Sequence, residues 1–146
     1  VNDYYQGLCH VNQIFGKGTP DNVNGFYALR FSDFVLSCTD PLNTNNEKFF
    51  GGFTGAGGAA DTPLVKTGQW YNLTFTYDGS DAKIYLNGDL KWSWHISVSF
   101  VSNSQDLFIG RDEDNVQFPY WFNGVIDEIR IYNRALPDGA VKQLSD

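Results

Sequence analysis

Residues 121–136 read WFNGVIDEIRIYNRAL. Side chains alternate between the two faces of a strand, and this pattern predicts one long strand over Trp121–Asn133. Val125, Ile129 and Ile131 then share one face, and Asp127 lies on that same apolar face. A carboxylate in line with branched aliphatic side chains is costly unless N–H donors or a cation satisfy it. The stretch therefore predicts a β fold and makes Asp127 the first candidate for a functional residue.

Strand and turn signals continue on the N-terminal side of this stretch. Residues 71–77 alternate aromatic or aliphatic residues with Asn and Thr, which predicts a half-buried strand. Asn87-Gly88 predicts a two-residue hairpin between a strand at 83–86 and an extended run at 90–100. We also expect strands at 26–31, 34–36 and 106–111, a loop at the glycine-rich residues 51–58, and one helical turn at 137–144. Many short strands separated by turns predict an all-β sandwich or jelly roll of two antiparallel sheets.

These motifs together resemble a known family. Residues 122–136 are similar to the closing signature of laminin G-like, concanavalin A-like jelly rolls, many of which occur in bacterial surface and secreted proteins. Residues 70–79 and 83–88 resemble the central hairpins of that family, residues 107–111 its next strand, and residues 14–18 an early strand. The resemblance spans most of the chain in the right order and implies the fold. It implies no single function, because such folds host lectins, adhesion modules and spacers.

The resemblance also concerns the limits of the domain. Domains of this type usually open with further strands before the segment that matches Ile14. We therefore expect residues 1–146 to form one laminin G-like domain that belongs to a larger exported polypeptide, with N-terminal strands missing from this sequence. An extracellular or bacterial cell-surface location follows from the same resemblance, and neighbouring domains of that polypeptide are then natural partners.

Charge and composition exclude several classes of function. The 146 residues include 16% aromatic and 18% charged residues, which fits one folded all-β domain. A net charge of −7, with only 10 dispersed Lys and Arg residues, excludes a nucleic-acid interface. No run of about 18 apolar residues is present, so we expect no membrane insertion. The acidic surface suits solubility and permits calcium binding.

Cys9 and Cys38 are the two cysteines of the chain. An even number of cysteines in a chain that looks exported predicts a disulfide between the N-terminal segment and the strand region near residues 34–36. Two buried thiols are the alternative.

Calcium is the cofactor that the acidic residues suggest. Asp127 could ligate a structural Ca²⁺, as in some relatives of this fold, or it could accept backbone N–H groups or pair with an arginine such as Arg111. Asp112 and Asp114 belong to the densest acidic cluster, residues 112–115, whose close oxygen ligands suit calcium. A solvated loop tip is the alternative for that cluster.

Aromatic side chains are the natural platform for a sugar, because rings pack against the apolar faces of pyranoses. Trp92 and Trp94 share one face of the extended run, and Tyr120 and Trp121 form a second cluster. Phe53 lies in the glycine-rich stretch, where a loop could carry a binding residue. Burial in the core is the alternative for the two clusters, and a plain loop is the alternative for Phe53.

The sequence contains little that supports catalysis. Glycosidases on related sandwiches use a Glu-x-Asp-x-x-Glu type of strand, which does not occur here. His10 and His95 are isolated in the sequence, without a serine elbow or companions at metal-ligand spacing. We expect a non-catalytic carbohydrate-binding or adhesion module whose partner is a glycan or a cell-surface or matrix component. The alternatives are a structural spacer or protein-interaction domain of a large adhesin, and an accessory domain of a secreted glycoside hydrolase.

Overall fold

The computed structural model describes residues 1–18, 27–33, 38–53, 56–59, 64–97, 102–112 and 119–145. Its elements in chain order are the 3₁₀ turn η1 (Leu8–His10), β1 (Asn12–Lys17), β2 (Tyr27–Ser32), β3 (Lys48–Phe53), β4 (Ala56–Ala59), β5 (Leu73–Tyr77), β6 (Asp81–Leu86), β7 (Asp89–His95), β8 (Leu107–Ile109) and the helix α1 (Asp138–Leu144).

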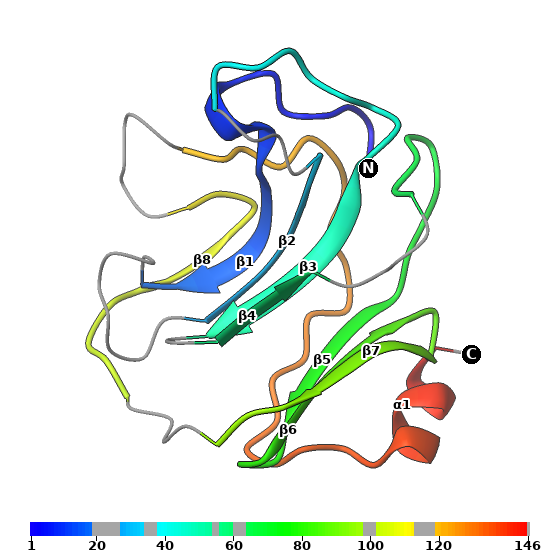
Figure 1. The fold of residues 1–146 in the computed structure, drawn as a ribbon. Helices are drawn as coiled ribbons and strands as arrows, with labels where there is room; N and C mark the ends of the chain where they lie inside the picture. The colour runs from blue at the N-terminus through cyan, green and yellow to red at the C-terminus, as the bar shows by residue number, and fades with distance from the viewer. Residues whose placement is uncertain are drawn as a thin grey trace.

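The strands form two antiparallel sheets, which confirms the predicted all-β sandwich (Figure 1). One sheet has five strands in the order β4-β3-β2-β1-β8, and the other has three in the order β5-β6-β7. Helix α1 lies beside the three-stranded sheet (Figure 1). The strands expected at 71–77, 83–86 and 106–111 are present as β5, β6 and β8, and the strand expected at 26–31 is present as β2. The strand expected at 34–36 lies outside the described residues.

The core lies between the two sheets. Phe31 of β2 and Phe49 of β3 are buried together with Val65 and with Leu86 of β6. The rings of Phe31 and Phe49 meet edge to face, with their centroids 5.7 Å apart. Because these side chains come from both sheets, their burial holds the two layers together.

The other side of the three-stranded sheet is covered by α1. Val141 is fully buried against Tyr85 of β6 and Leu136. Lys83 Nζ and the Tyr85 hydroxyl each lie 2.8 Å from Asp138 Oδ1 at the start of the helix. The expected helical turn is therefore present, and it is anchored by apolar packing of Val141 and by polar contacts of Asp138 and Lys142.

The Asn87-Gly88 hairpin between β6 and β7 follows from its two residues. Asn87 has φ 53° and Gly88 has φ 74°, both in the left-handed region that a tight hairpin of this kind requires. The following strand β7 ends at His95, and residues 98–100 of the expected extended run lie outside the described residues.

The expectation of a loop at residues 51–58 is wrong, because this stretch supplies the end of β3 and the strand β4. The glycines serve close packing rather than loop flexibility. A Cβ at Gly51 would lie 2.8 Å from Leu29 Cδ2 and 3.1 Å from Phe75 Cδ2 of the opposite sheet. A larger residue there would push the sheets apart.

The expectation of a long strand over Trp121–Asn133 is also wrong. Asn123 forms an isolated bridge with Asp3, and residues 124–133 form no strand. Glu128 has φ 52°, which breaks the alternation on which the predicted faces depended. Val125, Asp127 and Ile131 are accordingly exposed, so Asp127 is not a carboxylate buried among aliphatic side chains.

Candidate functional site

An exposed tryptophan is held beside an arginine where residues 119–123 run along the end of β8. Phe122 N–H donates to Gly110 O and Asp112 N–H donates to Pro119 O, each at 2.9 Å. Two aromatic rings flank the Arg111 guanidinium, whose central carbon lies 4.9 Å from the centroid of Phe108 and 5.8 Å from that of Trp121. Trp121 keeps 50% of its surface exposed. We refer to Phe108, Arg111 and Trp121 as the Trp121 surface.

Asp112 and Tyr120, which flank this surface in the sequence, act on a buried charge. Burial lowers the pKa of the Arg30 guanidinium, and the Asp112 carboxylate and Tyr120 act in the opposite direction. Asp112 is buried, so it is not the solvated loop tip considered from the sequence. Tyr120 is partly buried, and its ring meets Tyr5 edge to face with centroids 6.5 Å apart. Asp112 and Tyr120 are thus turned toward other parts of the fold, and the Asp112 N–H ties the two segments that carry the Trp121 surface.

The other predicted ligand-binding aromatics lie in different places. Trp92 and Trp94 of β7 stack on each other, with centroids 4.3 Å apart and planes at 23°, and both are partly buried. They belong to the three-stranded sheet, whereas Trp121 lies beside the five-stranded one. Phe53 ends β3, and its side chain lies outside the description.

The predicted calcium ligands are not brought together by the described residues. Asp127 is exposed and accepts the N–H of its neighbour Glu128 at 2.8 Å. The Arg111 guanidinium contacts aromatic rings, as described above. Asp114 lies outside the described residues. Within the described ranges, no group of three or more His, Cys, Asp and Glu side chains is arranged to hold a metal ion.

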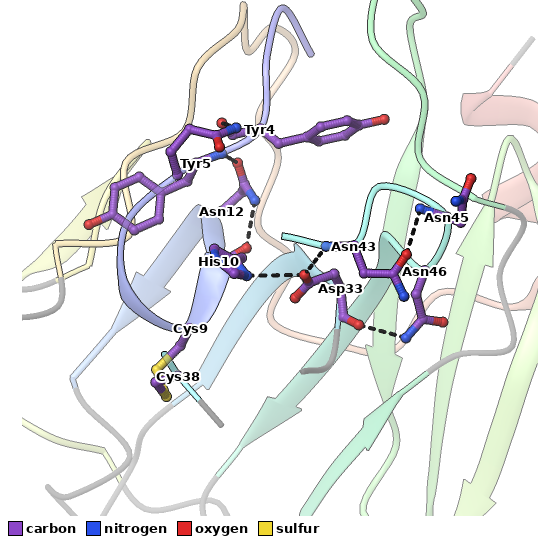
Figure 2. A network of polar contacts seen from close by, with 11 residues as sticks. Tyr4, Tyr5, Cys9, His10, Asn12, Asp33, Cys38, Asn43, Asn45 and Asn46 are labelled. Carbon is purple, nitrogen blue, oxygen red and sulfur yellow. Dashed lines mark hydrogen bonds and ion pairs between the residues drawn. A yellow bond between two sulfur atoms is a disulfide. The ribbon is translucent and has the colours of Figure 1, made fainter. Parts of the chain in front are cut away.

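Sequence reasoning missed a buried polar cluster at the ends of β1, β2 and β3 (Figure 2). The Asp33 carboxylate lies 3.0 Å from His10 Nδ1 and accepts the Asn43 N–H at 2.7 Å. The Asp33 carbonyl accepts a hydrogen bond from the Asn46 side chain at 2.6 Å. His10 is therefore not isolated, because the fold brings it to a carboxylate 23 residues away in the chain. The oxygen-rich run Asn43–Glu47, directly before Lys48, is the sequence signal that could have indicated the cluster.

Glu47 is the most unusual member of this cluster. It is 0% exposed, and neither carboxylate oxygen has a hydrogen-bond partner among the residues that the structure describes. Burial, and then the negative charge of Asp33, raise the pKa of Glu47 to about 8. Glu47 is therefore mostly protonated at neutral pH.

A disulfide between Cys9 and Cys38 closes the cluster on one side (Figure 2). Cys9 N–H also donates to Cys38 O at 3.2 Å. The bond ties the turn before β1 to the segment that follows β2, which are the two segments that carry His10 and Asp33.

Comparisons with known proteins identify the family. The sequence matches the concanavalin A-like lectin/glucanases superfamily over residues 17–142. The chain belongs to this superfamily. This membership agrees with the two antiparallel sheets and with the resemblance noted from the sequence. The name covers both binding and catalytic proteins, so the family alone does not decide the function.

No curated protein has a sequence significantly similar to this chain. Among solved structures, the chain is similar to an S-layer domain-containing protein (residues 221–444) from Clostridium thermocellum ATCC 27405, with a TM-score of 0.45 and 19% identity. The alignment covers 100% of this chain but 66% of that one, so the chain spans just under two thirds of the related structure. Values this low transfer no role from one protein to the other. None of the described helices is long and apolar enough to cross a bilayer.

Proposed function

We propose that this domain is a non-catalytic carbohydrate-binding module of a secreted or cell-surface protein, and that the glycan packs on the Trp121 surface. The observation that carries the proposal is the half-exposed indole of Trp121 with the Arg111 guanidinium near its ring. An indole offers a flat apolar face to the C–H groups of a pyranose, and a guanidinium supplies several N–H donors for sugar hydroxyls. The two groups together suit an amphipathic ligand such as a sugar.

The disulfide supports the proposed location outside the cell. Disulfides persist in oxidising compartments and are rare in the cytosol. The Cys9–Cys38 bond is therefore what an exported domain would contain. Membership of a superfamily whose name includes lectins agrees with a binding role.

The same superfamily name includes glucanases, so a glycoside hydrolase is the catalytic alternative to a binding module. Glycoside hydrolysis needs two carboxyl groups in contact with the substrate, one protonated and one ionised. Glu47, whose pKa is raised to about 8, and its neighbour Asp33 have that asymmetry of charge. They are 0% and 1% exposed, so a sugar cannot reach them. Their burial argues for a binding module rather than a hydrolase that uses this pair.

Calcium held by Asp127, or by Asp112 and Asp114, stays a prediction. The charge of Asp112 acts on the buried Arg30 guanidinium, and this cation competes with a metal ion for the same carboxylate. Asp127 lies at an exposed position, where a single carboxylate binds calcium weakly.

A glycan array tests the proposal, with the domain in calcium and again in chelator. Trp121→Ala should remove binding, whereas Trp70→Ala, at a tryptophan that is 69% exposed, should leave binding intact. Circular dichroism should show that both variants fold. Binding that survives Trp121→Ala but is lost in Trp92→Ala would place the sugar site on β7 instead. Loss of binding in chelator would establish a calcium-dependent lectin.

A second function is favoured by the exposed apolar residues after the Trp121 surface. Val125 and Ile131 are 59% and 60% exposed, and Ile129 and Tyr132 are also exposed. Exposed apolar residues that gather in one segment are typical of protein–protein contacts. A folded domain that binds no glycan in either buffer would therefore favour a protein-interaction domain or spacer of an adhesin. An accessory domain beside a hydrolase would share the sugar-binding result.

A further inference from the structure

Two backbone edges of the molecule lack a neighbour among the described residues. β5 is the outermost strand of the three-stranded sheet, and no strand of the described ranges pairs with its other edge. Residues 124–131 form no ladder with another segment of those ranges, although their alternating sequence is that of a strand. β5 also contains none of the lysine or proline residues that block many sheet edges. Both edges are therefore open to an added strand, and we refer to β5 and residues 124–131 together as the strand-acceptor edge.

The first residues of the chain show where an added strand would lie. Asp3 forms an antiparallel bridge with Asn123, and a Cβ at Gly124 would lie 3.1 Å from Val1 Cα. On its other side, Val1 O accepts the Gly68 N–H at 2.8 Å, shortly before β5 begins. Val1 therefore lies between the two parts of the strand-acceptor edge.

The two parts of this edge run in the same direction. Residues 124–131 run from beside the N-terminus toward the far end of the three-stranded sheet, as β5 does (Figure 1). One strand can therefore be antiparallel to both, and this is the direction that Asp3 already has relative to Asn123. Continuing that register sets Val1 opposite Val125, and a strand that ends beside Val1 then lies opposite residues 126–131. Val1 packs against the core, so side chains of the added strand that share its face point inward.

The side chains along the strand-acceptor edge define the chemistry of its occupant. Val125, Ile129 and Ile131 are exposed, as is Trp70 just before β5. Apolar side chains at alternate positions of an added strand would cover the aliphatic ones and remove them from water. Asp127 belongs to the same row and is exposed, so a lysine opposite it would pair with the carboxylate.

We propose that the strand-acceptor edge binds an extended segment of a separate polypeptide as an added β-strand. The segment runs antiparallel to β5 and to residues 124–131, with its C-terminal end beside Val1, apolar side chains at alternate positions and a lysine opposite Asp127. Main-chain hydrogen bonds to both edges supply affinity, and the alternate side chains supply specificity. Glu128, whose φ is 52°, takes up the extended conformation of a paired strand when the segment binds. The proposal specifies the partner of the protein-interaction alternative above, and it is independent of sugar binding at the Trp121 surface.

A synthetic peptide of sequence Thr-Val-Thr-Val-Thr-Lys-Thr tests the proposal with residues 1–146. In the proposed register its lysine falls opposite Asp127 and its valines fall opposite Ile129 and Ile131. The melting temperature of the protein should rise by about 5–10 °C at a peptide concentration 100 times Kd. Amide hydrogen exchange of residues 125–131 and of β5 should slow by about tenfold or more in the complex. The same peptide with proline in place of its second valine should do neither, because proline lacks the N–H that the ladder needs.

An exchange of charge tests the register. Asp127→Lys should bind the lysine peptide roughly tenfold more weakly than the wild type does, and should recover affinity for Thr-Val-Thr-Val-Thr-Glu-Thr. Asp106→Lys is the matched control, because Asp106 is exposed and lies outside the strand-acceptor edge, and it should prefer the lysine peptide as the wild type does.

Other results would overturn the proposal. No rise in the melting temperature of the folded protein with the lysine peptide, or an equal rise with the proline peptide, would exclude strand addition. Slower exchange confined to β7 or β8 would place the peptide at a different edge. Self-association that protects residues 125–131 would identify a second copy as the occupant. Protection only when the seven residues are fused ahead of Val1 would identify a covalently joined strand instead of a separate partner.

Discussion

The clearest quantitative consequence of the fold is the pH dependence that Glu47 imposes on stability. Its pKa is about 8 in the folded protein, against a reference value of 4.5. Between these values the folded state keeps a proton that the unfolded state has released. The free energy of unfolding therefore falls as pH rises. The contribution of Glu47 to stability is fully present below pH 4.5 and is lost progressively up to pH 8. The difference of 8 − 4.5 = 3.5 units, at about 1.4 kcal/mol each, amounts to roughly 5 kcal/mol.

Glu47→Gln isolates this contribution, because a glutamine side chain keeps the size and does not titrate. The free energy of unfolding should be measured by urea titration with tryptophan fluorescence, in chelator, at pH values from 5 to 9. Relative to Glu47→Gln, the wild type should lose about 4 kcal/mol across this range, most of it between pH 5 and 8, because the remainder of the change lies below pH 5. Water entering the cluster would reduce the loss, so this magnitude is an upper value.

Glu128→Gln serves as the control and should run parallel to the wild type, because Glu128 is exposed. Parallel curves for the wild type and Glu47→Gln would contradict this prediction, since they would show that Glu47 titrates alike in the folded and unfolded states.

Three further predictions concern stability. Replacing Cys9 and Cys38 by serine should cost about 3–4 kcal/mol in urea unfolding, because the bond joins residues 29 apart, and dithiothreitol should have no effect on the doubly substituted protein. Gly88→Ala should cost about 1–3 kcal/mol more than Gly68→Ala in the same assay. Both glycines have nearly the same positive φ, but a Cβ at Gly88 would overlap helix α1 while one at Gly68 would meet nothing. Asp127→Ala should change the free energy of unfolding by less than about 0.5 kcal/mol, because the side chain is exposed, and a loss of several kcal/mol would restore the buried position expected from the sequence.

Local sequence patterns correctly predicted those strands and turns that are determined by a few neighbouring residues. The alternation in 71–77 produced β5, and Asn87-Gly88 produced the hairpin between β6 and β7, because two residues that tolerate positive φ decide such a turn. The local pattern gave a wrong prediction for the glycine-rich residues 51–58. Glycine tolerates both loops and closely packed strands, and only the nearness of Leu29 and Phe75 shows why Gly51 lies in β3.

The signature stretch shows the limit of periodicity most directly. The alternation over residues 121–133 describes which side chains would share a face of a strand, but a strand needs a neighbour whose backbone pairs with it. Pairing reaches Asn123, and beyond it the positive φ of Glu128 turns the chain. The aliphatic residues and Asp127 are exposed as a result.

The candidate sites also differ in how much of each could be predicted from the sequence. The sequence named Trp121 and Asp112, but only the fold brings the Trp121 ring close to Arg111 and the Asp112 charge close to Arg30. His10, Asp33 and Glu47 carried no motif, because they are separated in the chain and meet only where three strand ends converge.

Residue type and local spacing were enough to predict the fold class, the hairpins, the cysteine pair and the supply of aromatic and acidic side chains. Which of those side chains are exposed, and which carboxyl groups lie close together in the core, became clear only from the folded chain. Burial and charge proximity depend on distances between segments, and those distances are set by packing rather than by order along the chain.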